Sequence, residues 1–106
     1  MRHRVVFSPE AEDQLAALYG YIATAASPGI AERHVNAIVT YCEGLDTFPL
    51  RGAKRDDIRP GLRITNYKGR TVIAFAVEAR QVSIMGVFYG GQDYETALEG
   101  DIEDEG

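Results

Sequence analysis

Two hydrophobic periodicities divide the chain into a helical first half and a β-rich second half. In the first half, apolar residues recur every three or four positions, as on one face of an α-helix. In the second half they tend to alternate with polar residues, as in a strand with one buried face. The two patterns meet at Thr47-Phe48-Pro49, because Pro49 cannot continue a helix.

The first half predicts two helices, each introduced by a Ser-Pro pair. The serine is a favourable N-cap and the proline suits the first helical position. The first helix is expected from Pro9 to about Ala25, and the second from about Gly29 to Asp46. The short connection between them predicts an antiparallel helical hairpin. The apolar stripes that it would bury are Ala11, Leu15, Leu18 and Ile22, followed by Val35, Ile38, Val39, Cys42 and Leu45.

Four strands are predicted around this hairpin. One precedes it at residues 4–7, and three follow a loop over residues 50–61, at 62–67, 71–77 and 81–89. Strict alternation in the last strand would place Val82, Ile84 and Phe88 on one face.

The order β-α-α-β-β-β predicts an α+β fold, in which an antiparallel sheet is covered on one face by the helical hairpin. A length of 106 residues fits one domain, which we assign to residues 1–98. Residues 99–106 hold five acids and no base. We expect this tail to be disordered on its own.

The net charge of −5 conceals a basic middle segment. The chain has 16 acids, five of them in the tail, so the remainder holds 11 bases and 11 acids. Residues 51–80 alone carry eight bases against three acids. This segment could meet an acidic partner or a phosphate backbone, or simply form a solvated strand face.

Several chemistries find no support in the sequence. His3 and His34 are the only histidines, and no metal-binding, phosphate-binding or nucleophile motif occurs, so neither a metal nor a cofactor is expected. The single cysteine, Cys42, lies on a helical stripe and is interpreted as a small buried hydrophobe. No apolar run is long enough to span a membrane, and no signal-peptide pattern occurs, so a cytoplasmic protein is expected.

Arginines and tyrosines are the remaining chemical candidates. An arginine can stabilise a phosphoryl transition state, and a tyrosine can move a proton, which would allow RNA cleavage without a metal. The residues for that reading are Arg63, Arg70, Arg80 and Tyr89. Arginine and tyrosine are also common anchors of protein interfaces, which is the reading the sequence favours.

Four segments together resemble a known family: VVFSPEAEDQLAALYGYIA, FPLRG, IRPGLRITNYKGRTVIAFAVE and VSIMGVFYGGQDYETAL. Their order and spacing over about residues 4–98 are similar to the ParE branch of the RelE/ParE toxins. The resemblance implies a RelE-like fold and a toxin of a type II toxin–antitoxin system. It further implies neutralisation by a ParD-like antitoxin and inhibition of DNA gyrase, without direct sequence-specific DNA binding by the toxin alone.

The chain departs from that family at the end of the last strand. Members often have His-Gly followed by Arg-Asp, whereas this chain reads Tyr89-Gly90-Gly91-Gln92-Asp93. The tyrosine keeps open the alternative of a ribosome-dependent mRNA endonuclease of the RelE type. A non-toxic relative that only binds an antitoxin is the third possibility.

We expect the antitoxin to place apolar side chains between the hairpin and the sheet, and acids against the basic segment. The expected antitoxin contacts are Leu18, Tyr19, Tyr41, Arg59, Arg63 and Arg70.

Overall fold

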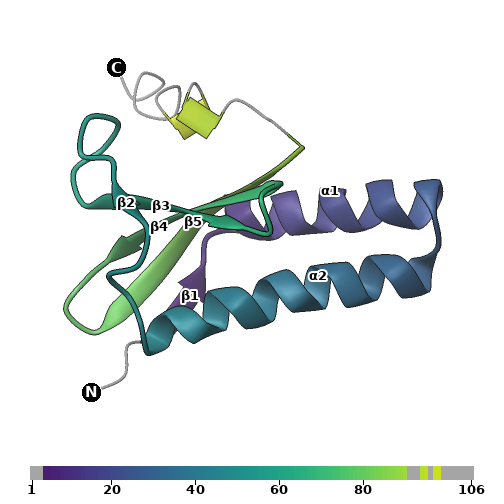
Figure 1. Ribbon diagram of the computed structural model, residues 1–106, viewed down its shortest axis with the longest axis horizontal. Helices are drawn as coiled ribbons and strands as arrows, with labels where there is room; N and C mark the ends of the chain where they lie inside the picture. The colour runs from purple at the N-terminus through teal and green to yellow at the C-terminus, as the bar shows by residue number, and fades with distance from the viewer. Residues whose placement is uncertain (1–3, 91–93, 96, 99–106) are drawn as a thin grey trace.

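The computed structural model describes residues 4–90, 94–95 and 97–98 of the chain. Figure 1 shows a helical hairpin packed against a twisted sheet. The elements are β1 (Arg4–Phe7), α1 (Pro9–Ala25), α2 (Pro28–Glu43), the 3₁₀ turn η1 (Gly44–Asp46), β2 (Ala53–Lys54), β3 (Leu62–Tyr67), β4 (Thr71–Val77) and β5 (Gln81–Tyr89).

Both helices begin where the Ser-Pro pairs predict. The Ser8 hydroxyl accepts a hydrogen bond from the amide of Ala11 at 3.0 Å, and the Ser27 hydroxyl accepts one from Ile30 at 3.2 Å. Each cap satisfies one of the amides that a helix leaves without an internal partner. The last predicted turn of α2 tightens into η1, so the α-helix proper ends at Glu43.

The sheet has five strands in the order β1-β5-β4-β3-β2. The predicted α+β fold with a hairpin over the sheet is confirmed, but the sheet is mixed rather than wholly antiparallel. β1 runs parallel to β5, while β5–β4, β4–β3 and β3–β2 are antiparallel pairs. Periodicity shows which residues form strands and not which strands are neighbours, so it gave no sign of the parallel pair.

Two local features of the sheet also differ from the prediction. The predicted loop over residues 50–61 contains β2, which pairs with β3 through Ala53–Ile64 and Lys54–Arg63. In addition, the pairing of β4 with β5 shifts at a bulge, since Ala74 pairs with Gly86 and Phe75 with Ile84. A bulge inserts one extra residue and reverses the alternation beyond it.

The bulge explains why the expected face of β5 is wrong. Val82 and Ile84 pack against the hairpin, but Phe88 belongs to the apolar cluster on the other face. Val87 takes the place facing the hairpin instead.

The main core lies between the hairpin and the sheet. Phe75 is fully buried at its centre, with Ile38 and Cys42 of α2 also at zero exposure. Cys42 is therefore the buried hydrophobe that the sequence predicts. The other buried members are Ala11, Leu15, Leu18, Leu45, Ile73, Val82, Ile84 and Val87.

A second, smaller cluster lies on the opposite face of the sheet. Its buried members are Ile58, Leu62, Ile64, Ala74, Phe88 and Leu98. Leu98 and the half-buried Tyr94 come from the C-terminal end of the described chain and cover part of this face. No helix among the described residues is long and apolar enough to cross a membrane.

Two glycines with positive φ provide a matched test of this packing. Gly52 (φ +82°) lies where an added Cβ would collide with the backbone carbonyl of Ile64, whereas a Cβ at Gly69 (φ +75°) would meet nothing within 4 Å. We expect Gly69→Ala to lower the free energy of unfolding by about 1 kcal/mol, the cost of the left-handed conformation. Gly52→Ala should cost about 3 kcal/mol, because overpacking adds to that strain. Urea titration measures both, and equal losses would contradict the close approach at Gly52.

Candidate functional site

The hairpin is longer than the sheet that it covers. α1 begins halfway along β5, where the amide of Ser8 donates to the Ile84 carbonyl at 2.9 Å. Its 17 residues then extend about 26 Å at 1.5 Å per residue. The remainder of β5, up to Tyr89, spans only about 17 Å. The helices therefore run past the sheet, as Figure 1 shows at the end where α1 turns into α2.

Two hollows open at this end, one beside each helix. The α1 hollow has a volume of about 380 Å³ and the α2 hollow about 410 Å³. Arg70 and Tyr89 line both hollows and separate them. The other residues of the α1 hollow are Gln14, Ala17, Leu18, Tyr21, Val87 and Gly90. Those of the α2 hollow are Ile30, Arg33, His34, Ala37, Tyr67, Lys68 and Thr71.

Stacked side chains form the wall between the hollows. The guanidinium carbon of Arg70 lies 5.7 Å from the ring centre of Tyr89, a cation–π distance. The His34 ring meets Tyr89 edge-on, with ring centres 5.6 Å apart. His34 Nε2 is buried and has no hydrogen-bond partner within the described part of the chain. The His34 ring therefore has a packing role, and within the described part of the chain its Nε2 is left without a hydrogen bond.

The charged side chains that line the hollows are all positive. Arg33, Lys68 and Arg70 line the α2 hollow, and the described lining of both hollows includes no carboxylate. Lys68 Nζ also lies 5.6 Å from the ring centre of Tyr67. Apolar surface with uncompensated cations suits a ligand that carries both apolar groups and negative charge.

An aromatic contact continues the α2 hollow along the seam between α2 and β3. The rings of Tyr41 and Tyr67 lie 4.9 Å apart. The Tyr41 hydroxyl is 3.1 Å from the Thr65 hydroxyl, and it accepts a hydrogen bond from Arg51 Nη1 at 3.3 Å. Tyr41 is therefore fixed between the helix and the sheet, with its ring only partly buried.

The structure places the expected antitoxin contacts on more than one surface. Leu18 is a core residue that also lines the α1 hollow, and Tyr19 is exposed on α1 outside both hollows. Arg59 lies near the second cluster, with Nη1 4.0 Å from Met85 Sδ. Arg63 donates to the backbone carbonyls of residues 50 and 51, at 2.6 and 3.2 Å. Only Leu18 and Arg70 of the expected set line the hollows, and Tyr41 adjoins them.

The fold likewise does not bring together the four residues that were candidates for RNA cleavage. Arg70 and Tyr89 meet at the open end of the hairpin. Arg80 lies in the turn between β4 and β5, at the opposite end of these strands. Arg63 pairs with Phe75 of β4 and its guanidinium holds the preceding loop.

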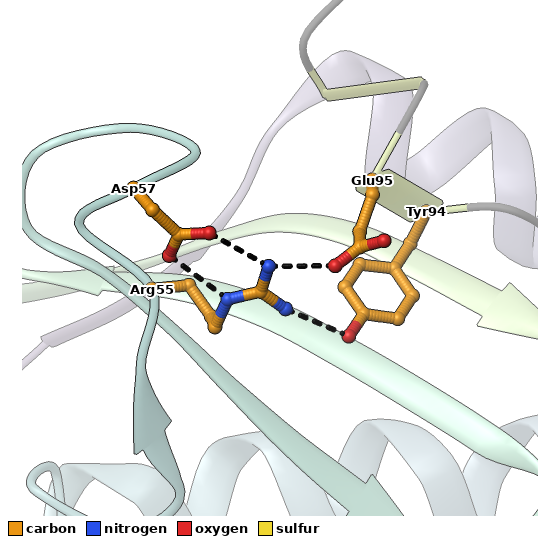
Figure 2. Close-up of polar contacts among 4 residues, drawn as sticks. All are labelled: Arg55, Asp57, Tyr94 and Glu95. Carbon is orange, nitrogen blue, oxygen red and sulfur yellow. Dashed lines mark hydrogen bonds and ion pairs between the residues drawn. The ribbon is translucent and has the colours of Figure 1, made fainter.

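A polar cluster around Arg55 was not apparent from the sequence. Figure 2 shows its guanidinium between Asp57, Tyr94 and Glu95. Arg55 donates to both carboxylate oxygens of Asp57 at 3.0 and 2.9 Å, to Glu95 at 2.6 Å and to the Tyr94 hydroxyl at 3.1 Å. Because 39 and 40 positions separate Arg55 from Tyr94 and Glu95, no local pattern could have indicated these contacts. We call these four residues the Arg55 clasp.

Ionisation follows from these contacts. The hydrogen bonds with Asp57, and then with Glu95, raise the pKa of Arg55, and Arg55 in turn holds the pKa of Asp57 below its usual 3.8. Burial, with a smaller effect from Glu43, raises the pKa of Cys42 to about 12, so this thiol stays protonated. No three His, Cys, Asp or Glu side chains in the described ranges form a group that could hold a metal ion.

The fold is similar to that of proteins of known structure. The chain is similar to one in the chromosomal ParDE toxin–antitoxin system from P. aeruginosa, with a TM-score of 0.73 and 21% identity over 84% of this chain and 97% of that one. It is also similar to one in the RelBE2 toxin–antitoxin complex from Mycobacterium tuberculosis, with a TM-score of 0.62 and 19% identity over 84% and 99%. The molecule thus has an α+β fold found in toxin–antitoxin complexes.

The sequence identifies the family. Residues 5–94 match the profile of the ParE toxin of type II toxin–antitoxin systems, parDE. The chain therefore belongs to the ParE toxin family. No curated protein matches it.

The Arg55 clasp predicts how the C-terminal end is held. Arg55→Met removes the hydrogen-bond donors and keeps an apolar stem, so amide exchange around Tyr94 and Glu95 should accelerate. Lys54→Met is the matched control, because the exposed Lys54 makes no described side-chain contact. Hydrogen–deuterium exchange measures the difference. Unchanged exchange in Arg55→Met would show that the clasp does not hold this segment.

The clasp should also weaken in acid. Asp57 has its pKa lowered in the folded state, so its stabilising contribution is present above the unfolded value of 3.8. It is lost as the pH falls through the lower folded pKa. Amide exchange around Asp57 in the wild type should therefore approach that of Arg55→Met at the same pH as the pH falls below about 3.8.

Proposed function

We propose that this chain is a cytoplasmic toxin that a ParD-like antitoxin holds inactive and that acts on DNA gyrase. Membership of the ParE toxin family supports the toxin role. The observation that carries the antitoxin proposal is the pair of hollows around Arg70, whose described lining combines cations and apolar side chains without a carboxylate.

The chemistry of the hollows supports an antitoxin as the partner that binds there. An antitoxin segment would place apolar side chains beside Leu18 and carboxylates on Arg70, and would reach Tyr41 along the α2–β3 seam. Contact with Tyr19 or Arg59 requires the segment to continue onto other surfaces of the toxin. Such a wrapped segment buries a large area and binds tightly even if it orders only on binding.

Gyrase as the target rests on the ParE resemblance and the family match. Action by binding, rather than by catalysis, is supported by the separation of the RNA-cleavage candidates. Arg80 and Arg70 lie at opposite ends of the sheet, and Arg63 has an internal role in holding a loop. A shared transition state needs its stabilising groups within hydrogen-bond reach of the same atoms.

Purified toxin should inhibit gyrase directly. Added to gyrase, ATP and relaxed plasmid, it should reduce supercoiling or trap cleaved DNA, and equimolar antitoxin should reverse the effect. Gyrase that keeps full activity at a large excess of toxin would count against this target. Cleavage of mRNA at the ribosomal A site on induction would favour the RelE-type alternative instead.

Arg70 should be central to antitoxin binding. Arg70→Glu places a carboxylate where the antitoxin presents its own, so the affinity should fall roughly 30-fold or more. Arg4→Glu makes the same charge change on the exposed Arg4 of β1, outside the lining of both hollows, and should leave the affinity unchanged. Isothermal titration calorimetry with the antitoxin encoded beside the toxin measures both. Equal affinities for the two variants would argue against the hollows as the antitoxin site.

A further inference from the structure

A second surface, separate from the hollows, has the character of a protein contact. Phe48 and Leu50, in the loop between η1 and β2, are 61% and 69% exposed. They border a shallow hollow of about 430 Å³ lined by residues 47–51. Large apolar side chains that are grouped and exposed commonly mark an interaction site. We call residues 48–51 the 48–51 loop.

Contacts with the sheet anchor the C-terminal part of this loop. Arg63 of β3 donates to the carbonyl of Leu50 at 2.6 Å and to that of Arg51 at 3.2 Å. Directly after the loop, Gly52 lies against the carbonyl of Ile64 in a conformation that favours glycine. A loop fixed in this way loses little conformational entropy on binding, which favours affinity.

Cations flank the exposed apolar side chains. The guanidinium of Arg51 lies between two rings, 5.5 Å from that of Tyr41 and 5.7 Å from that of Phe48. Among the described residues, Arg55 forms ion pairs with Asp57 and Glu95. Neither Arg51 nor Lys54 takes part in these pairs. Stacking therefore orients Arg51 while leaving donors for a carboxylate from outside.

We propose that the 48–51 loop is the surface through which the toxin contacts its target, a folded protein that offers an apolar pocket rimmed by carboxylates. The inference rests on the proposed function in one respect, that the toxin acts by binding a protein. Phe48 and Leu50 would enter the pocket, and Arg51 and Lys54 would meet its acidic rim. A phosphate backbone would satisfy the cations but leave both apolar side chains without contact.

The target and the antitoxin would bind surfaces of different shape on the toxin. The hollows around Arg70 are concave and can receive side chains from an extended segment. The side chains of the 48–51 loop are mostly exposed, so they need a preformed cavity on the other molecule. If the two partners bind separate surfaces, a substitution can weaken the binding of one partner and leave the binding of the other unchanged.

The test uses the full-length toxin in two variants, the loop variants, with substitutions in the 48–51 loop or directly after it. Phe48→Ser/Leu50→Ser removes the apolar contact, and Lys54→Glu reverses a charge beside it without touching Tyr41. Arg4→Glu is the charge-matched control. Three properties are measured: growth after induction without antitoxin, affinity for the cognate antitoxin, and melting temperature. Gyrase inhibition by the purified variants provides the quantitative readout.

Both loop variants should melt like the wild type and bind antitoxin with unchanged affinity. They should fail to arrest growth, and about tenfold or more protein should be needed for half-inhibition of gyrase. Arg4→Glu should behave as the wild type throughout. Growth arrest by the loop variants at wild-type strength would overturn the inference alone, and so would loss of antitoxin affinity with toxicity retained. If the wild type itself did not arrest growth, the proposed function would fail as well.

Discussion

The packing of the helical hairpin on the sheet is the constraint from which the rest of the structure follows. α1 and α2 bury their apolar stripes against each other and against the sheet, where Phe75 of β4 is fully enclosed. Because α1 starts halfway along β5, the hairpin must extend past the strands. The hollows beside Arg70 are thus a consequence of the same connection that completes the core.

Local chemistry was readable from the sequence and long-range arrangement was not. The serine caps, Pro49 and the two periodicities predict α1 and the three long strands closely. The parallel pairing of β1, the bulge beside Gly86 and the Arg55 clasp depend on residues far apart along the chain. No spacing rule reports such contacts, so the lining of the α2 hollow by Arg33 and Lys68 was missed as well.

The basic segment shows why a charge count is a weak guide to function. Arg55 and Arg63 use their donors within the molecule, on carboxylates and on backbone carbonyls. Arg70 and Arg51 are stacked on aromatic rings and have no carboxylate partner in the part of the chain that the structure describes. The first pair organises the fold, and the second pair is available to other molecules. All four residues look alike in the sequence.

The central proposal is that an antitoxin binds and neutralises this molecule. Without the antitoxin, the molecule would inhibit a target protein. Co-expression in a bacterial host tests this claim most directly, by following colony formation with the toxin alone and with its neighbouring antitoxin. The account predicts that the toxin alone abolishes colony formation and that the antitoxin restores it. Normal growth of cells that accumulate folded, antitoxin-free protein would contradict it.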